Sequence, residues 1–167
     1  MTILIDGTSG ITYPQGATQI VGAGPAFSAY ASASQTVTTA TQTKVAIDTE
    51  NFDTNSNFDT TNYRFTPTVA GYYQVNGSLR GTGTTTFTSI AGYIYKNGSP
   101  SKRAQITASL TAGNNTSITV SDIIYMNGST DYLELWGNIN GTGTLTFTSA
   151  NSTDQTSYFS ACLLRGA

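Results

Sequence analysis

The chain has 167 residues, which suits one domain with a short extension and is long enough to bury a core without disulfides. Charged residues make up only 10% of it, against about 25% in ordinary domains, and the formal net charge is −2. With no basic cluster, no nucleic-acid partner is expected. With no run of about 18 apolar residues, no membrane span is expected, and the N-terminus shows no secretory signal.

Residues 1–24 differ in composition from the rest of the chain, because glycines alternate with short apolar runs. Such a segment makes no core of its own, so we expect an extended arm or a small hairpin that packs on a neighbour. A flexible linker is the alternative. An anchoring arm would use these side chains: Ile3, Ile5, Ile11, Tyr13, Pro14 and Ile20. The stretch 5–16 resembles N-terminal or linker pieces of tailed-bacteriophage structural proteins.

The remaining residues, 25–167, are expected to form one domain of short strands. The first strand is expected at residues 27–31, and a second strand with its approach at residues 34–46. A long loop rich in Asn, Asp and Thr is expected at residues 48–62. In residues 71–79 apolar and polar side chains alternate with a period of two, which gives each set its own face of a strand. Tyr73, Val75 and Leu79 are expected to face inward, as are Leu133, Leu135 and Ile139 at the positions 60 residues later.

A set of spaced anchors runs through this region. The anchors are Ile47, Asp53, Phe58, Phe65, Gly71, Tyr73 and Val75. Their spacing resembles the diagnostic pattern of the C1q-like family, related to tumour necrosis factor (TNF), in which an aromatic residue is followed by Asp or Asn, two aromatics and Gly-x-Tyr-x-Phe. Ile47 and Val75 stand where that pattern has aromatic residues, and both remain apolar.

Two later stretches resemble the same family. Residues 130–135 resemble its Gly-Asp-x-Val-x-Leu strand, and residues 157–164 resemble its closing strand. The three matches occur in the family's order and cover roughly residues 25–167. The resemblance implies an all-β, antiparallel jelly-roll β-sandwich of the C1q/TNF type, while it says little about function.

An internal repeat has a period of 60 residues. Residues 70–89 align without gaps on residues 130–149, and ten of the twenty positions are identical. Each copy is interpreted as a strand, a Gly-Thr-Gly turn and a second strand, so two equivalent hairpins are expected; convergent Thr- and Gly-rich composition is the alternative. A shorter echo, Asn97-Gly98 and Asn127-Gly128, follows two further strand ends and is a hairpin signal. No helix is expected.

The residues that enzymes use most are missing or isolated. The chain has no histidine, which removes the commonest general base and metal ligand. Its one cysteine, Cys162, has no internal disulfide partner, and its strand position favours a buried, inert thiol. The segment Gly81-Thr82-Gly83 opens no helix and is no phosphate loop. We therefore expect no enzymatic activity and no cofactor.

Four acidic residues of the polar loop are the only candidate metal ligands in the sequence: Asp48, Glu50, Asp53 and Asp59. Carboxylates suit Ca²⁺, and some members of the resembled family bind it. Their spacing fits no calcium-loop motif, so we expect a solvated loop in which Asp53 hydrogen-bonds locally, with no metal bound.

The resemblance also implies a homotrimer. In the resembled family the three strands that match residues near 73, 134 and 160 lie in an inner sheet against the threefold axis. The residues of these strands that face away from the core would make the contact: Tyr72, Gln74, Tyr132, Glu134, Trp136, Tyr158 and Ser160. Large aromatics on a non-core face are typical of interface centres. The alternative is that they are isolated surface residues covered by their own loops.

Three functions remain open. The first is a non-enzymatic structural protein on the virion exterior of a bacteriophage, whether a capsid decoration or cement protein, a fibre, or a tail-attachment module. Its partners would be other capsid or tail proteins. The second is a receptor- or glycan-binding tip of a tail fibre, which would contact a host surface glycan or protein, with Trp136 as the candidate sugar-stacking residue. The third is a free bacterial C1q-like binding protein.

Overall fold

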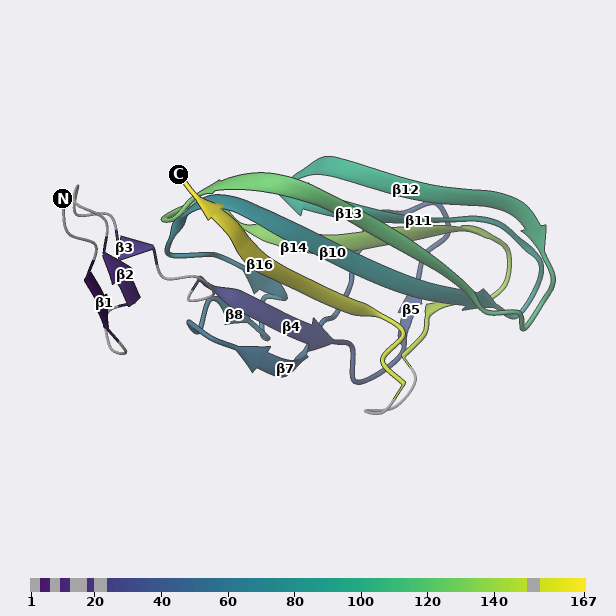
Figure 1. Ribbon diagram of the computed structural model, residues 1–167. Coiled ribbons are helices and arrows are strands. Elements are labelled where there is room, and N and C mark those ends of the chain that lie inside the picture. Colours follow the sequence, from purple (N-terminus) through teal and green to yellow (C-terminus); the bar gives the residue numbers. More distant parts are fainter. Residues whose placement is uncertain (1–3, 7–9, 13–17, 20–23, 150–153) are drawn as a thin grey trace.

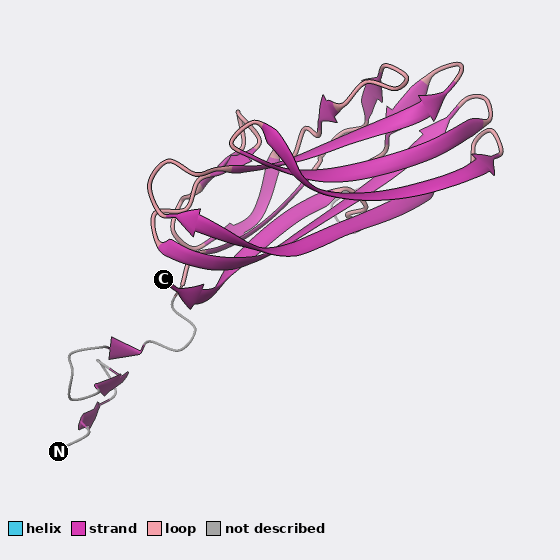
Figure 2. Cartoon of the chain, turned by 90° about the horizontal axis from the view of Figure 1, so that it is seen from above, coloured by secondary structure: helices cyan, strands magenta, loops and turns pink. Residues whose placement is uncertain are grey.

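The computed structural model describes residues 4–6, 10–12, 18–19, 24–149 and 154–167. This part of the chain contains sixteen strands and no helix, so no helix of the described residues crosses a membrane. The long strands form two layers packed face to face, as Figures 1 and 2 show. The expected antiparallel β-sandwich is confirmed.

One layer is a seven-stranded sheet, named the β10 sheet after its longest strand, β10 (Ala70–Gly83). Strand β13 lies along one side of β10, while β16 and β15 share the other side. Strands β4 and β7 continue the sheet beyond β16, and β5 continues it beyond β15. Their bounds are β13 (Thr116–Asn127), β16 (Tyr158–Gly166), β15 (Leu145–Phe147), β4 (Ala26–Tyr30), β7 (Thr49–Asp53) and β5 (Gln35–Val37).

The second layer is a six-stranded sheet, named the β14 sheet after its central strand, β14 (Leu133–Gly141). Strand β11 lies on one side of β14, with β12 beyond it. Strands β6 and β9 lie on the other side, and β8 pairs with β9. Their bounds are β11 (Phe87–Lys96), β12 (Ser99–Leu110), β6 (Thr43–Lys44), β9 (Arg64–Phe65) and β8 (Phe58–Asp59).

An aromatic cluster fills one end of the core. The ring of Phe27 stacks on Phe58 and Phe65, with centroid distances of 4.6 and 4.5 Å, and Phe159 meets it edge-on at 5.3 Å. Tyr73 joins the cluster through Phe65, and its hydroxyl donates to the carbonyl oxygen of Val69 at 2.8 Å. Burial raises the pKa of Tyr73 to about 12. Phe58, Phe65 and Tyr73 are three of the predicted anchors, so the spaced pattern marks core positions.

The repeat has the predicted alternation but not the predicted hairpins. All six predicted inward side chains are buried: Tyr73, Val75, Leu79, Leu133, Leu135 and Ile139. However, β10 and β11 belong to different sheets, and so do β14 and β15. The Gly-Thr-Gly segments therefore carry the chain from one layer to the other. Alternation reports the face of a strand, and a glycine turn allows either a hairpin or a crossing, so the sequence did not distinguish them.

One of the two predicted Asn-Gly hairpin turns is confirmed, and the other is wrong. The Asn97-Gly98 turn joins the hairpin β11–β12, with φ angles of 53° and 77°. By contrast, Asn127-Gly128 leads from β13 in one sheet to β14 in the other. The predicted loop 48–62 contains β7 and β8, which cover the Phe27 end of the core.

Strands β1 (Leu4–Asp6), β2 (Gly10–Thr12) and β3 (Thr18–Gln19) form a separate antiparallel sheet. The pairing of β1 with β2 places Ile5 opposite Ile11, as a small hairpin requires. The other predicted anchoring residues, Ile3, Tyr13, Pro14 and Ile20, lie outside the described residues. The domain division at residue 24 stays a prediction.

Candidate interaction face

The outer face of the β10 sheet is the candidate site. Residues paired across neighbouring strands point to the same side, so the register arranges this face in rows. One row crosses β7, β4, β16, β10 and β13, a second crosses β4, β16, β10 and β13, and a third crosses β16, β10 and β13, where Arg165 of β16 is paired with Tyr72 at the edge of the face. We call these residues the interaction face: Phe52, Ser28, Ser160, Asn76 and Ser121; Ala26, Cys162, Gln74 and Ile123; Tyr72 and Tyr125.

One end of the interaction face is apolar and open to solvent. Tyr72, Ile123 and Tyr125 have exposed fractions of 46%, 50% and 42%. The rings of Tyr72 and Tyr125 contact each other across β10 and β13, with their centroids 5.5 Å apart. Strand β13 pairs only with β10 among the described strands, so these side chains stand at a sheet edge. Clustered apolar groups on a folded surface mark interaction sites more often than isolated ones do.

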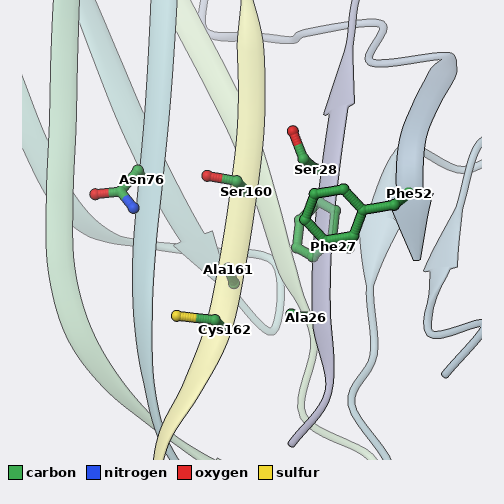
Figure 3. Close-up of a pocket in the computed structure, with 8 residues that line it drawn as sticks. All are labelled: Ala26, Phe27, Ser28, Phe52, Asn76, Ser160, Ala161 and Cys162. Carbon is green, nitrogen blue, oxygen red and sulfur yellow. The ribbon is translucent and has the colours of Figure 1, made fainter. Parts of the chain in front are cut away.

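The other half of the face holds an open depression of about 320 Å³. Its floor consists of small side chains from adjacent strands, Ser28 on β4 and Ser160 and Cys162 on β16, with Asn76 on β10 beside them. The ring of Phe52, which is 51% exposed, reaches from β7 to form one wall (Figure 3). A protruding side chain could occupy this depression without displacing a large group.

The chemistry of the face suits association. None of its eleven residues carries a charge, and the nearest cations, Arg165 beside Tyr72 and Lys96 beside Tyr125, lie at its rim. The described residues contain no group of three or more Cys, Asp and Glu side chains placed to hold a metal ion. Amides and hydroxyls at the centre, with aromatics around them, form the kind of surface that protein interfaces use.

Four of the predicted interface residues lie on this side of the β10 sheet: Tyr72, Gln74, Tyr158 and Ser160. The sequence argument missed Ile123, Tyr125 and Phe52. The alternation of β13 held a signal for the first two, because they point opposite to the buried Ile124 and Met126. The prediction that Cys162 is buried is wrong, because its side chain is exposed on this face.

The other three predicted residues lie elsewhere. Strand β14 follows Tyr132 and carries Glu134 and Trp136, and it belongs to the opposite sheet. Their side chains point to the far surface of the sandwich, away from Tyr72 and Tyr158. Grouping them in one inner sheet was therefore wrong. The period of two gives the side of a strand that a residue takes, and not the sheet that the strand joins.

Glu134 is instead the centre of a buried ionic cluster. Its carboxylate, 2% exposed, accepts hydrogen bonds from Lys44 Nζ and Arg64 Nη2, both at 2.8 Å, and from Trp136 Nε1 at 2.9 Å. Burial disfavours the charge, but the hydrogen bonds from Lys44, Trp136 and Arg64 outweigh it and hold the pKa of Glu134 below its usual value. The cluster ties β6 and β9 to β14.

Trp136 is covered in the same way. Its ring stacks on Tyr95 with centroids 4.5 Å apart, and Lys44 Nζ lies 5.9 Å from the ring centroid. The Tyr95 hydroxyl donates to the side-chain carbonyl of Gln42, which lies on the segment before β6. Tyr95 of β11 therefore covers one face of the Trp136 ring, and the side chain is only partly exposed. This arrangement favours the alternative interpretation, in which the aromatic is covered within one copy of the chain.

Three acidic residues of the predicted loop 48–62 accept hydrogen bonds from other residues of the chain. Asp53 accepts from the backbone N–H groups of Phe58 at 2.7 Å and Asn55 at 3.2 Å, which confirms the expected local hydrogen bonding. Asp48 accepts from the N–H and hydroxyl of Ser32, at 2.8 and 2.7 Å. Asp59 accepts from the side chain of Asn62 at 2.6 Å. Asp53 and Asp59 are therefore held within their own turns, while Asp48 ties its segment to Ser32.

Comparison with known proteins supports the fold. No family model matches the chain, and no curated protein sequence matches it. Among solved structures it is similar to the Eiger TNF of S. frugiperda, with a TM-score of 0.64 and 10% identity over 86% of this chain and 93% of that one. It is also similar to the globular domain of zebrafish complement 1qA (TM-score 0.58, 12% identity, 86% and 99% covered) and to murine APRIL (0.62, 10%, 84% and 99%).

These similarities define the class of fold. The two layers and the strand order described above form a jelly-roll sandwich of the C1q/TNF type, as the sequence pattern predicted.

Proposed function

We propose that this chain is a non-enzymatic structural module that assembles as a homotrimer through the interaction face. The observation that carries this proposal is the set of large apolar side chains exposed on one side of the β10 sheet, with Tyr72, Ile123 and Tyr125 at one end and Phe52 at the other. Apolar side chains of this size are costly to leave in water. A closed ring of copies buries them without growing into a filament.

The number of subunits rests on the fold. The sequence resembles a family in which the strands that match residues near 73, 134 and 160 lie in an inner sheet against a threefold axis. Two of these three strands, β10 and β16, lie together in the β10 sheet of this chain. Light scattering coupled to size exclusion tests the proposal directly, since a molar mass near three times 17.5 kDa supports it and a monomer overturns it.

We further propose that the trimer stands on the exterior of a bacteriophage particle, held by the arm of residues 1–24. The support is the resemblance of residues 5–16 to segments of tailed-phage structural proteins, together with the separate sheet formed by β1–β3. Capsid decoration, a fibre and tail attachment all fit this role. Immunogold labelling of purified virions would separate head from tail, and unlabelled particles would contradict the virion location.

A receptor- or glycan-binding tip is the second candidate function. Trp136 is a poor sugar-stacking residue for this role, because one face of its ring is stacked on Tyr95. The exposed tyrosines of the interaction face are open in one copy, but the proposed trimer buries them. A free bacterial C1q-like binding protein would use the same trimer without an anchoring arm. Binding assays on the intact trimer against host surface glycans and proteins would favour either alternative if they gave saturable binding.

A further inference from the structure

We infer that the exposed side chains of β13 in one copy, Ile123 foremost, occupy the depression beside Phe52 on the next copy. The inference rests on the homotrimer proposed above and names the contact that closes it. A second copy of this chain is therefore the occupant of the depression.

The two halves of the interaction face complement each other in shape. Ile123 projects from an edge strand and is 50% exposed, so half of a branched apolar side chain has no cover in one copy. The depression has a floor of small side chains and a wall formed by an exposed aromatic ring. Placing an aliphatic side chain against that ring removes apolar surface of both partners from water.

One copy cannot make this contact with itself. Ile123 and the floor residue Cys162 are both paired with Gln74, on opposite sides of β10. Two strand spacings of about 4.8 Å each therefore separate them along a rigid sheet. Each copy thus presents one projecting side chain and one empty depression, and the pairing is satisfied only between copies.

The face supplies part of the area that the contact needs. Its eleven residues take alternate positions on their strands, each about 4.8 Å by 6.6 Å, which gives a flat area of about 350 Å². A standard stable interface takes about 800 Å² from each partner, so the relief of the side chains and the residues around the face contribute the rest. None of the eleven residues is charged, and the cation of Arg165, which is paired with Tyr72, lies at the rim.

Disulfide trapping tests the contact, because Cys162 is the only cysteine of the chain and lies on the floor of the depression. Ile123→Cys gives each chain two thiols, which are too far apart within one copy for a disulfide, since a disulfide requires Cα atoms within about 7 Å. Mild oxidation of the full-length variant is followed by a denaturing gel without reductant. The matched control is Gln105→Cys, which is exposed on β12 at the opposite surface.

A covalent trimer from Ile123→Cys, absent from Gln105→Cys, supports the contact. The wild-type chain has one thiol and reaches a covalent dimer at most, so a covalent trimer cannot come from Cys162 alone. A covalent dimer from Ile123→Cys, at a yield well above that of the wild type, also supports the contact while overturning the threefold symmetry. A variant that remains a trimer by light scattering but forms no such product overturns the inference and leaves the proposed function standing.

A second variant checks the same contact without oxidation. Ser160→Trp fills the depression from its floor with a large ring, so the trimer is expected to dissociate at least tenfold more readily upon dilution. Thr107→Trp, on the exposed surface of β12, is the control for added bulk. A Ser160→Trp trimer with unchanged dissociation would overturn the inference.

Discussion

Thr84 and Thr144, equivalent residues of the two repeat copies, hydrogen-bond to each other at one end of the sandwich. The backbone N–H of Thr84 donates to the carbonyl oxygen of Thr144 at 3.0 Å, and the N–H of Thr144 donates to Thr84 Oγ1 at 2.9 Å. The two crossings between the layers therefore support each other. The repeat is a local pseudo-symmetry in which each copy packs on the other.

The reciprocity continues into the core. A Cβ added at Gly77 would lie 2.5 Å from Leu135 Cδ1, and one added at Gly137, its repeat equivalent, would overlap Leu79 Cδ2. Leu79 and Leu135 are themselves fully buried in the sandwich. Each copy therefore keeps a glycine where the other copy inserts a leucine.

We expect Gly137→Ala to destabilise the fold by about 1–3 kcal/mol, because the new methyl group would overpack a close-packed core. For a domain of this size this corresponds to a fall in Tm of roughly 2–12 °C, measurable by circular dichroism. Gly166→Ala is the control, since a Cβ there meets no atom within 4 Å. Equal melting temperatures for the two variants would contradict the reciprocal packing.

The Glu134 cluster predicts how stability depends on pH. The pKa of Glu134 is lowered in the folded chain from an ordinary value of 4.5, so its contribution is fully present above that value. It is lost as the pH falls through the lowered folded pKa. We expect Glu134→Gln to cost about 2 kcal/mol at pH 7, because the hydrogen-bond donors of three side chains, Lys44, Arg64 and Trp136, lose a charged acceptor.

Thermal melts of wild type and Glu134→Gln between pH 7 and pH 2 measure this effect. The two curves are expected to converge at the acid end, where the wild-type carboxylate is protonated as well. Asp122→Asn is the matched control, because the Asp122–Lys102 pair at 3.1 Å is much more open to solvent. A Glu134→Gln deficit that persists unchanged at pH 2 would show that the charge of Glu134 is not its cause.

The acidic turns predict an absence of strong calcium binding. The carboxylates of Asp53 and Asp59 already accept hydrogen bonds from their own turns, and that of Asp48 accepts from Ser32, so a cation would have to displace these contacts. Weak extracellular calcium sites bind Ca²⁺ at concentrations on the order of millimolar. We expect Ca²⁺ at such a concentration to leave the Tm of this protein unchanged. We expect Asp53→Ala to lower stability by about 1–2 kcal/mol through loss of its two backbone contacts. A clear rise of Tm with calcium would contradict this prediction.

The sequence predicted the core of this protein better than its surfaces. Phe58, Phe65 and Tyr73 are spaced along the chain because they meet in one aromatic cluster, and that spacing is visible without coordinates. Assignment of a strand to a sheet is different, because it depends on partners far away in the chain. Strand β14 has the same inward pattern as β10 and yet joins the opposite layer.

The residues of the interaction face could be predicted only in part, because strand pairing is not visible in the sequence. Tyr72 was found because it alternates with the anchor Tyr73, but Tyr125 lies beside it only through the pairing of β10 with β13. The ionic cluster of Glu134 with Lys44 and Arg64 joins residues up to 90 positions apart, which no local pattern reports. Pairwise contacts of this kind require the fold.

Removal of the arm separates anchoring from folding. The buried apolar residues of the described chain run from Phe27 to Ala161, so deletion of residues 1–24 leaves this core intact. We expect a folded trimer whose Tm changes by only a few degrees and which is no longer incorporated into virions. The measurement is the amount of protein in purified particles from a complementation experiment. The control is a chain in which the sequence of residues 1–24 is shuffled. If the truncated chain were incorporated as well as the wild type, residues 1–24 would not be the anchor.

The two outer faces of the sandwich predict opposite behaviour for two aromatic substitutions. Tyr125 is 42% exposed on the interaction face, so Tyr125→Glu leaves the monomer folded but introduces a carboxylate that the trimer would have to remove from water, with only Lys96 Nζ close enough to offset it. We expect it to run as a monomer in light scattering, with its circular dichroism spectrum unchanged. Combining it with Ile123→Glu should remove any residual association.

Trp136→Glu should do the reverse. The ring stacks on Tyr95 at 4.5 Å and its Nε1 donates to Glu134 at 2.9 Å, so the substitution removes both contacts and places two carboxylates side by side. Loss of a packed aromatic costs about 3–5 kcal/mol, and the damage lies within one copy. We therefore expect a lower Tm with the trimer retained wherever the chain is folded. If Trp136→Glu gave a stable monomer while Tyr125→Glu remained a trimer, the contact would lie on the β14 sheet and the interaction face defined above would be wrong.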